Sequence, residues 1–249
     1  MSTGRLLWDA ACDLLLAPAC AGCAAAAGGG VLCRGCRARI CPAPVLVRPA
    51  AAPAGSLPAT TAACRYEGPV RRLLLAYKEQ GRLAAAWPLA TLLVAAVEAA
   101  AGPSAAAGGH LLLVPVPSRP GMRRRRGHDP VGRLAVLASR RLSGASGAGA
   151  VRAVPLLRHR GRVVDQAGLS SADRWHNLDG ALALHDPGNV LAAPGTLVVL
   201  VDDVCSSGAT LAAAAAALRP TAARVVAAVV AAPALERDRW PVPLRSGSD

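Results

Sequence analysis

The sequence contains no phenylalanine, and aromatic residues make up only 2% of its 249 residues. A protein that stacks nucleic-acid bases on a row of aromatic side chains is disfavoured, because two tyrosines and four tryptophans are too few for such a surface. Lysine is almost missing as well, since Lys78 is the only one. The apolar fraction of 53% is still ample for a core, which must consist mainly of alanine, leucine and valine. The length allows one large domain with a small appendage.

Membrane-crossing and leader segments are not expected either. Residues 6–17 are apolar and imitate a secretion signal, but Asp9 and Asp13 interrupt them. The i, i+4 spacing of these carboxylates predicts a short amphipathic helix instead. Residues 83–101 form a second apolar stretch, but it contains a proline and a glutamate and is rich in alanine. We expect a cytoplasmic protein without membrane insertion.

Positive charge is abundant but unevenly distributed along the chain. The formal net charge is +13, and residues 61–150 hold 13 basic against 4 acidic side chains. A concentrated positive potential favours polyanions such as pyrophosphate, nucleotides or nucleic acid. A solvated, arginine-rich surface explains the charge equally well, because alanine, arginine, glycine and proline are frequent throughout the sequence.

Cysteine is concentrated near the N-terminus, where seven of the eight cysteines precede residue 65. Two C-x2-C pairs lie nine residues apart, and in a cytosolic chain they indicate a tetrahedral zinc site rather than disulfides. The candidate ligands are Cys20, Cys23, Cys33 and Cys36. Cys12 or Cys41 could replace one of them, and metal-free thiols are the alternative. Bound zinc would be structural, because a small module with few apolar residues needs a metal to fold.

The chain is predicted to divide near residue 58. Residues 1–58 hold the N-terminal helix, the four-cysteine zinc module and a Pro/Ala-rich linker at 42–58, and residues 59–249 form the larger domain. The predicted strands of that domain are 64–66, 111–114, 198–201 and 222–231, and the predicted helices are 70–77, 83–101 (broken near Pro88) and 134–142. Apolar strands that alternate with helices predict an α/β fold with a parallel sheet flanked by helices.

The most specific pattern is the run of residues 198–210. Four apolar residues, typical of a buried parallel strand, lead into Asp202 and Asp203, after which a loop precedes an alanine-rich helix. The loop consists of Cys205, Ser206, Ser207, Gly208, Ala209 and Thr210. Its N–H groups, its hydroxyls and the helix N-terminus suit a phosphate, while carboxylates at a strand end suit a sugar diol. We interpret the run as a sugar-phosphate site, with a core strand and a structural turn as the alternative.

A second anion site is predicted directly after the strand at 111–114. Its residues are Ser118, Arg119, Arg123, Arg124, Arg125 and Arg126. In a parallel sheet they would lie at the same edge as Asp202 and Asp203, and guanidinium groups bind phosphate oxygens in bidentate fashion. A pyrophosphate group would fit this charge. An exposed loop that binds nucleic acid without specificity is the other interpretation.

Several motifs follow one another in a characteristic order. They are the two C-x2-C knuckles, Tyr66-Glu67-Gly68-Pro69, Lys78-Glu79-Gln80-Gly81, Val114-Pro115-Val116-Pro117-Ser118, Arg126-Gly127, Arg158, Gln166, Leu169-Ser170, Arg174, Asn177 and the run 198–210. The last of these resembles the 13-residue phosphoribosyl-pyrophosphate (PRPP) motif of type I phosphoribosyltransferases. The whole order resembles the ComF/GntX family, phosphoribosyltransferase-like proteins associated in some bacteria with natural competence. The resemblance covers nearly the full chain.

The resemblance implies a type I phosphoribosyltransferase-like sheet that binds PRPP together with Mg²⁺, but it does not settle the reaction. Transfer of the phosphoribosyl group to an unidentified acceptor is our leading hypothesis. The resemblance assigns the ribose contacts, and with them catalysis, to Asp202 and Asp203. By resemblance, residues 205–210 bind the 5′-phosphate and residues 117–126 the pyrophosphate. The remaining site residues belong to a mobile segment over the site: Gln166, Arg174 and Asn177.

The sequence departs from the family pattern at two places. His128-Asp129-Pro130 stands where the family usually has an aromatic residue and then Asn-Gln, and Ser206-Ser207 stands where paired threonine is commoner. The second change keeps the hydroxyls. The first leaves the roles of His128 and Asp129 open, and we expect His128 to be a loop surface residue rather than a general base.

A non-catalytic protein is the competing interpretation. It would be a zinc-stabilised basic adaptor or PRPP sensor that binds single-stranded DNA or DNA-processing proteins during DNA uptake. The charge excess of residues 61–150 motivates it. A purely structural zinc and α/β protein without a ligand is a third interpretation.

Overall fold

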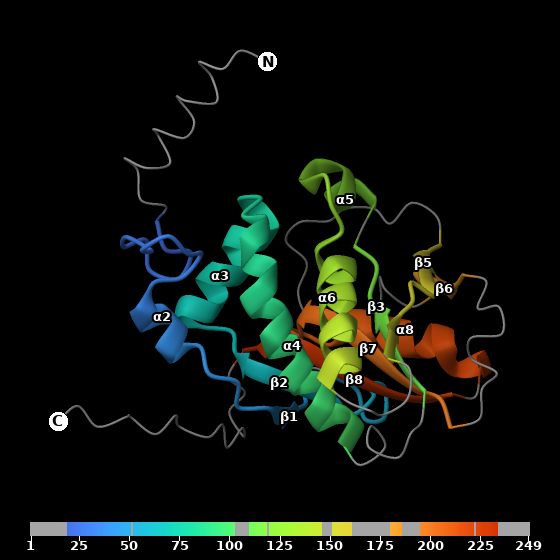
Figure 1. Cartoon of the computed structure of the whole chain (residues 1–249). Coiled ribbons are helices and arrows are strands. Elements are labelled where there is room, and N and C mark those ends of the chain that lie inside the picture. Colours follow the sequence, from blue (N-terminus) through green and yellow to red (C-terminus); the bar gives the residue numbers. More distant parts are fainter. Residues whose placement is uncertain are drawn as a thin grey trace.

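The computed structural model describes residues 19–50, 52–102, 110–118, 120–145, 151–160, 180–185, 195–221 and 223–233. In this part of the chain a six-stranded sheet, helices on both of its faces and a cysteine-rich N-terminal module make up the molecule (Figure 1). Some predictions fall outside these residues and concern the helix at 6–17, Cys12, Arg119, Gln166, Arg174 and Asn177.

The sheet is parallel except at one edge. In spatial order its strands are β1 (Val45–Val47), β2 (Thr60–Arg65), β8 (Arg224–Ala232), β7 (Leu197–Val204), β3 (Leu111–Pro115) and β4 (Val151–Ala153). Neighbouring strands run parallel apart from β1, which is antiparallel to β2. The predicted α/β architecture with a mostly parallel sheet flanked by helices is confirmed.

Both faces of the sheet are covered, so its central strands are apolar at every position rather than at alternate ones. Val199 and Val201 of β7 pack into a core with three helices, while Val198 and Leu200 pack into a second core on the opposite face. The first core contains α3 (Gly68–Glu79), α4 (Ala86–Ala101) and α6 (Pro130–Ala145). The second contains α8 (Ala209–Leu218), which η3 (Arg219–Thr221) extends, and the antiparallel pair β5 (Leu157–His159) and β6 (Leu182–Leu184).

Three local predictions are wrong. A 3-10 turn, η1 (Leu83–Ala85), leads into α4, so Pro88 lies within the first turn of α4. Pro88 does not break this helix, because a missing N–H in the first turn costs no helical hydrogen bond. The arginine run after β3 is not a loop but the helix α5 (Pro120–Arg126), because proline is favoured at a first helical position and arginine is a good helix former. The linker at 42–58 contains β1, whose backbone pairs with the edge of β2.

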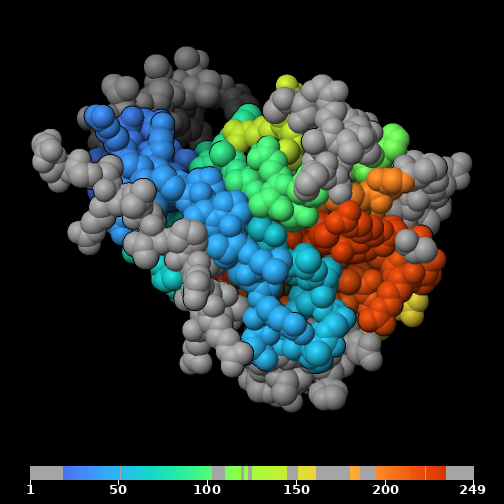
Figure 2. Space-filling model, turned by 90° about the horizontal axis from the view of Figure 1, so that it is seen from below, coloured from blue at the N-terminus to red at the C-terminus, as the bar shows by residue number. Residues whose placement is uncertain are grey.

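The cysteine-rich module is packed onto the larger domain. Its helix α2 (Arg34–Arg39) contributes Cys36 to the same apolar core as α3 and α4, together with Cys20 and Leu32. The Arg72 side chain of α3 also donates a hydrogen bond to the carbonyl of Gly22. In the space-filling view the blue residues of the module continue without a break into the cyan segment around β1 and β2 (Figure 2). The module therefore shares a core with the domain that follows it.

One helical segment, Leu83–Ala101, is long and apolar enough to cross a membrane by length and composition. Leu89, Leu93 and Val97 are fully buried in the core beside the sheet. The apolar character of this segment is accounted for by its place as a core helix.

Candidate functional site

Adjacent strands β3 and β7 create a topological switch point. They are parallel, and Pro115 at the end of β3 pairs with Val201, the residue before Asp202. The chain leaves β3 toward α6 on one face of the sheet, whereas it leaves β7 toward α8 on the other face. Ligands of open α/β sheets bind in the crevice that such diverging connections leave at the carboxyl ends of the strands. The sequence-predicted acids lie at this end of β7, and α5, which carries the arginine run, follows this end of β3.

The two carboxylates of β7 have different surroundings. Asp203 is 5% exposed and forms an ion pair with Lys78 of α3, in which Nζ lies 2.8 Å from Oδ2. Asp202 is half-buried, and its Oδ1 accepts a hydrogen bond of 2.8 Å from the Asp203 N–H. Burial, and next the neighbouring Asp203 charge, raise the pKa of Asp202 to about 8. The two carboxylates therefore differ: Asp203 is held in an ion pair with Lys78, whereas Asp202 readily carries a proton.

Lys78 is the site residue that the sequence analysis did not select. Burial alone would lower its pKa, but the Asp203 carboxylate raises the pKa above the ordinary value, so the side chain is a cation. The available signal was compositional, because a chain with 28 basic residues uses lysine only here.

The residues of the loop after β7 differ in how far their side chains are exposed. Gly208 has φ +78° at the N-terminus of α8, a left-handed conformation that favours glycine. Ser206 is exposed, Thr210 is half-buried, and Ser207 is buried with its Oγ 3.4 Å from the Ala209 N–H. Cys205 is buried in the core under the loop, and this burial raises the pKa of its thiol to about 12. Cys205 can therefore meet a phosphate only through its backbone.

The arginines of α5 have different surroundings. Arg126 at the end of α5 pairs with Glu79 of α3, with Nη2 2.5 Å from Oε1, and its side chain is 12% exposed. Arg125 is exposed. The side chains of Arg123 and Arg124 lie outside the described part of the structure, as does Arg119. Arg126 and Asp203 thus pair with successive residues of α3, Glu79 and Lys78.

The residues that depart from the family pattern have structural contacts. The Asp129 carboxylate accepts a hydrogen bond of 3.1 Å from the Gly132 N–H and so caps the start of α6, and Ser118 Oγ lies 3.5 Å from the same oxygen. The His128 ring packs against Tyr77 with 5.5 Å between ring centroids, and its Nδ1 lies 3.0 Å from the Arg126 carbonyl oxygen. His128 is half-buried and its Nε2 is enclosed, so it is not the surface residue that we expected.

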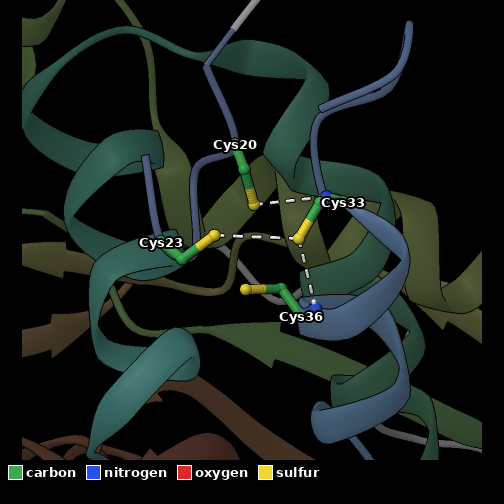
Figure 3. A group of neighbouring side chains, drawn as sticks. All are labelled: Cys20, Cys23, Cys33 and Cys36. Atoms are coloured by element: carbon green, nitrogen blue, oxygen red, sulfur yellow. Dashed lines mark hydrogen bonds between the residues drawn. The ribbon is translucent and has the colours of Figure 1, made fainter. Parts of the chain in front are cut away.

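Four cysteines of the N-terminal module converge on one point (Figure 3). The sulfur atoms of Cys20, Cys23, Cys33 and Cys36 all lie within 4.8 Å of one another. The Cys23 and Cys33 sulfurs are 3.7 Å apart, and two ligands at about 2.3 Å from a tetrahedral zinc ion would be about 3.8 Å apart. The cluster could therefore hold a metal ion and is compatible with structural zinc. Cys41 is exposed, with its thiol bonded to the Ala38 carbonyl instead.

Backbone N–H groups surround these sulfurs. Cys20 Sγ accepts hydrogen bonds from the N–H groups of Cys33 at 3.2 Å and Gly22 at 3.3 Å, and Cys33 Sγ accepts one from Cys36 at 3.4 Å. Burial would raise the pKa of Cys20, but these donors lower it to about 6. In Cys36, burial and the neighbouring thiols raise the pKa to about 12. A cation at the centre would bind thiolates, so it would reverse the second of these effects.

Comparisons with known proteins do not assign the site. No protein-family profile matches the chain, and no curated protein matches its sequence. The chemistry must therefore be argued from the residues near the carboxyl ends of β3 and β7: a carboxylate pair, a helix N-terminus preceded by hydroxyl residues, and basic side chains of α3 and α5.

Proposed function

We propose that the protein binds PRPP, or a closely related ribose phosphate, together with Mg²⁺ in the crevice between β3 and β7. The observation that carries this proposal is that successive residues of α3, Lys78 and Glu79, pair with Asp203 at the end of β7 and with Arg126 at the end of α5, the helix that follows the neighbouring strand β3. In this arrangement Asp202 and Asp203 bind the ribose hydroxyls, residues 205–210 bind the 5′-phosphate, and Arg126 lies on the pyrophosphate side. The family resemblance supports the same assignment.

The proposed reaction is transfer of the phosphoribosyl group to an acceptor. The bond between the anomeric carbon and pyrophosphate breaks through an oxocarbenium-like state, while negative charge grows on the departing group. Fixed cations beside that group lower the barrier because they are oriented before the reaction starts. Magnesium would contribute further neutralisation of the phosphates.

Structural zinc in the four-cysteine cluster is part of the proposal. Its support is the close approach of the four sulfur atoms and the sharing of Cys20 and Cys36 with the core of the larger domain. Zinc would then fix the position of α3, whose Arg72 contacts the Gly22 carbonyl. Metal analysis of freshly purified protein should find about one zinc per chain, and none in a Cys20→Ser variant.

Calorimetric titration with Mg-PRPP tests the proposed ligand. Wild type should release or absorb heat with a single-site curve, and Asp203→Asn should bind at least about tenfold more weakly, because it loses a charge-assisted contact. Glu98→Gln on the exposed side of α4 is the matched control for loss of one carboxylate, and its affinity should equal that of wild type. A wild-type protein that gives no heat over the millimolar range would disprove PRPP binding.

The sensor and adaptor alternatives make different predictions. A sensor would bind Mg-PRPP but release no pyrophosphate with any acceptor, whereas a transferase releases pyrophosphate in an acceptor-dependent manner. The adaptor rests on exposed basic residues such as Arg125 of α5. It predicts binding of single-stranded DNA that weakens with salt and is lost when residues 123–126 are neutralised.

A further inference from the structure

The last turn of α3 contacts three elements of the site through three successive residues. The Tyr77 hydroxyl donates a hydrogen bond of 3.0 Å to the carbonyl of the first residue of α6. The Lys78 ammonium lies 2.8 Å from the Asp203 carboxylate at the end of β7. Glu79 lies 2.5 Å from the Arg126 guanidinium at the end of α5. One helix turn therefore pairs with charged groups from two elements, Asp203 of β7 and Arg126 of α5.

The two ion pairs involve successive residues of α3. Arg126 lies close enough to Lys78 to act on its pKa, so the two ion pairs are neighbours rather than separate contacts. Two cations and two carboxylates sum to no net charge. The Asp203 side chain is 7% exposed and that of Lys78 24%, whereas Arg126 is 12% and Glu79 38% exposed, so water screens the Arg126–Glu79 pair more than the Lys78–Asp203 pair. Two side chains proposed here for the ligand, Asp203 and Arg126, are thus already paired with opposite charges from α3.

We propose that Lys78 and Glu79 are internal counter-ions. They pair with Asp203 and Arg126 while the site is empty, and these pairings are replaced by contacts with the ligand when it binds. This inference rests on the proposed function and adds how the site is kept ready. When a phosphorylated sugar binds, its hydroxyls form hydrogen bonds to the Asp203 carboxylate and its phosphate binds the Arg126 guanidinium. Lys78, no longer paired with Asp203, then lies near the ligand phosphate and adds a positive charge beside it. Glu79, by contrast, competes with the phosphate for Arg126 and must be displaced.

The choice of lysine agrees with this role. Lys78 is the only lysine, and the other basic residues among the 28 are arginine. A compact ammonium therefore stands at the position where, in this proposal, the buried Asp203 carboxylate is first paired and then released to the ligand. A guanidinium is a planar fork that binds a carboxylate through two parallel hydrogen bonds, whereas the lysine ammonium is a compact point charge. Lys78→Arg should consequently behave as a non-conservative change, with weaker ligand binding than wild type.

Counter-ion exchange predicts that removing the two α3 charges has opposite effects. Glu79→Gln frees Arg126 and should tighten binding of Mg-PRPP about threefold to tenfold. Lys78→Met removes a cation and leaves Asp203 unpaired, and it should weaken binding about tenfold or more. If the turn served only to hold the fold together, both variants would loosen the site and both would weaken binding.

Calorimetry with Mg-PRPP on wild type, Glu79→Gln and Lys78→Met tests the exchange, with Glu98→Gln as the control for a lost carboxylate. A second measurement uses the wild-type protein alone, which protects the test against a variant that does not fold. Lysine labelled with ¹³C at Cε gives one NMR signal, because Lys78 is the only lysine, and this signal should shift when Mg-PRPP is added.

The outcomes separate this inference from the proposed function. Tighter binding by Glu79→Gln together with a shifted Lys78 signal supports counter-ion exchange. Binding by wild type with an unchanged or weaker affinity in Glu79→Gln overturns the exchange and leaves PRPP binding intact. An absence of heat from wild type and from Glu79→Gln defeats both proposals.

Discussion

Gly22 lies so close to Cys36 that a Cβ atom at residue 22 would be 2.8 Å from the Cys36 sulfur. The first C-x2-C knuckle therefore needs glycine between its cysteines for reasons of space. Sulfur atoms that converge on one point leave no room for a side chain inside the turn, because a core contact this short forces neighbouring atoms to move.

Gly22→Ala should consequently weaken both metal binding and folding. We expect a loss of about 1–3 kcal/mol in the free energy of unfolding, because the added methyl group displaces a candidate ligand. Denaturant unfolding and zinc competition with a chromophoric chelator measure the two effects. Gly35→Ala is the matched control, since a Cβ at residue 35 in α2 meets nothing within 4 Å. It should stabilise the protein by about 0.5–1 kcal/mol, and equal behaviour of the two variants would contradict the argument.

Gly208→Ala should destabilise the loop before α8 through two separable causes. The residue has φ +78°, and an added Cβ would lie 2.5 Å from Leu57 Cδ1. We expect a cost of about 1 kcal/mol for the left-handed backbone and about 1–3 kcal/mol more for the clash. Gly195→Ala, with φ +74° and open space, should show the backbone cost alone.

A double-mutant cycle with Leu57→Ala isolates the clash at residue 208. Shortening Leu57 should recover the second part of the loss in Gly208→Ala, with a coupling energy of about 1 kcal/mol or more in urea unfolding. Strictly additive effects would show that the two side chains do not compete for the same space.

Asp202→Asn should make the protein more stable in neutral and mildly alkaline solution. The pKa of Asp202 is raised from 3.8 to about 8 in the folded protein. Between these pH values the unfolded chain has released a proton that the folded protein still holds, so the free energy of unfolding falls as pH rises and levels off above about pH 8. The amide cannot ionise, so the variant should lack this fall.

The expected gain for Asp202→Asn at about pH 8 is on the order of 1–3 kcal/mol, or a rise in Tm of roughly 2–4 °C per kcal/mol. Asp203→Asn should do the opposite and lower the Tm, because it leaves the Lys78 charge without its carboxylate. Thermal melts across pH 4–9 measure both. A wild-type melting profile parallel to that of Asp202→Asn would contradict the raised pKa.

Removal of bound metal should destabilise the whole molecule rather than the module alone. Cys20 and Cys36 belong to the same core as α3 and α4, so loss of the cluster exposes surface of both. We expect a strong chelator to lower the Tm of the main unfolding transition by roughly 5–10 °C, with recovery on addition of zinc. Melts followed by far-UV circular dichroism test this, and an unchanged main transition after complete metal removal would contradict the shared core.

Contiguous parts of the fold and of the site could be predicted from the sequence. The strand β7 with its two carboxylates, the loop after it and the start of α8 form one uninterrupted run, so their order and chemistry are local properties. The same holds for the two cysteine pairs, because a C-x2-C turn brings its own two thiols together wherever it occurs. The sheet of mostly parallel strands followed from the alternation of apolar runs and helices.

The errors arose where neighbours far away in the chain complete a structure. β1 was hidden in a Pro/Ala-rich segment because its three residues form a strand only when the edge of β2 offers hydrogen-bond partners. The arginine run seemed to be a loop after a Pro-Gly pair, yet Pro120 begins a helix. His128 was expected on the surface, but the Tyr77 ring covers it.

The sequence by itself determined the acid pair with its hydroxyl-rich loop and the four clustered cysteines, because each is fixed by spacing along a short segment. Only the tertiary structure decided that the sole lysine pairs with Asp203 and that Glu79 holds Arg126. Those contacts depend on how α3 packs against a sheet whose strands come from distant parts of the chain. An ion pair between remote residues has no signature in the sequence, since it forms only when burial brings the two charges together.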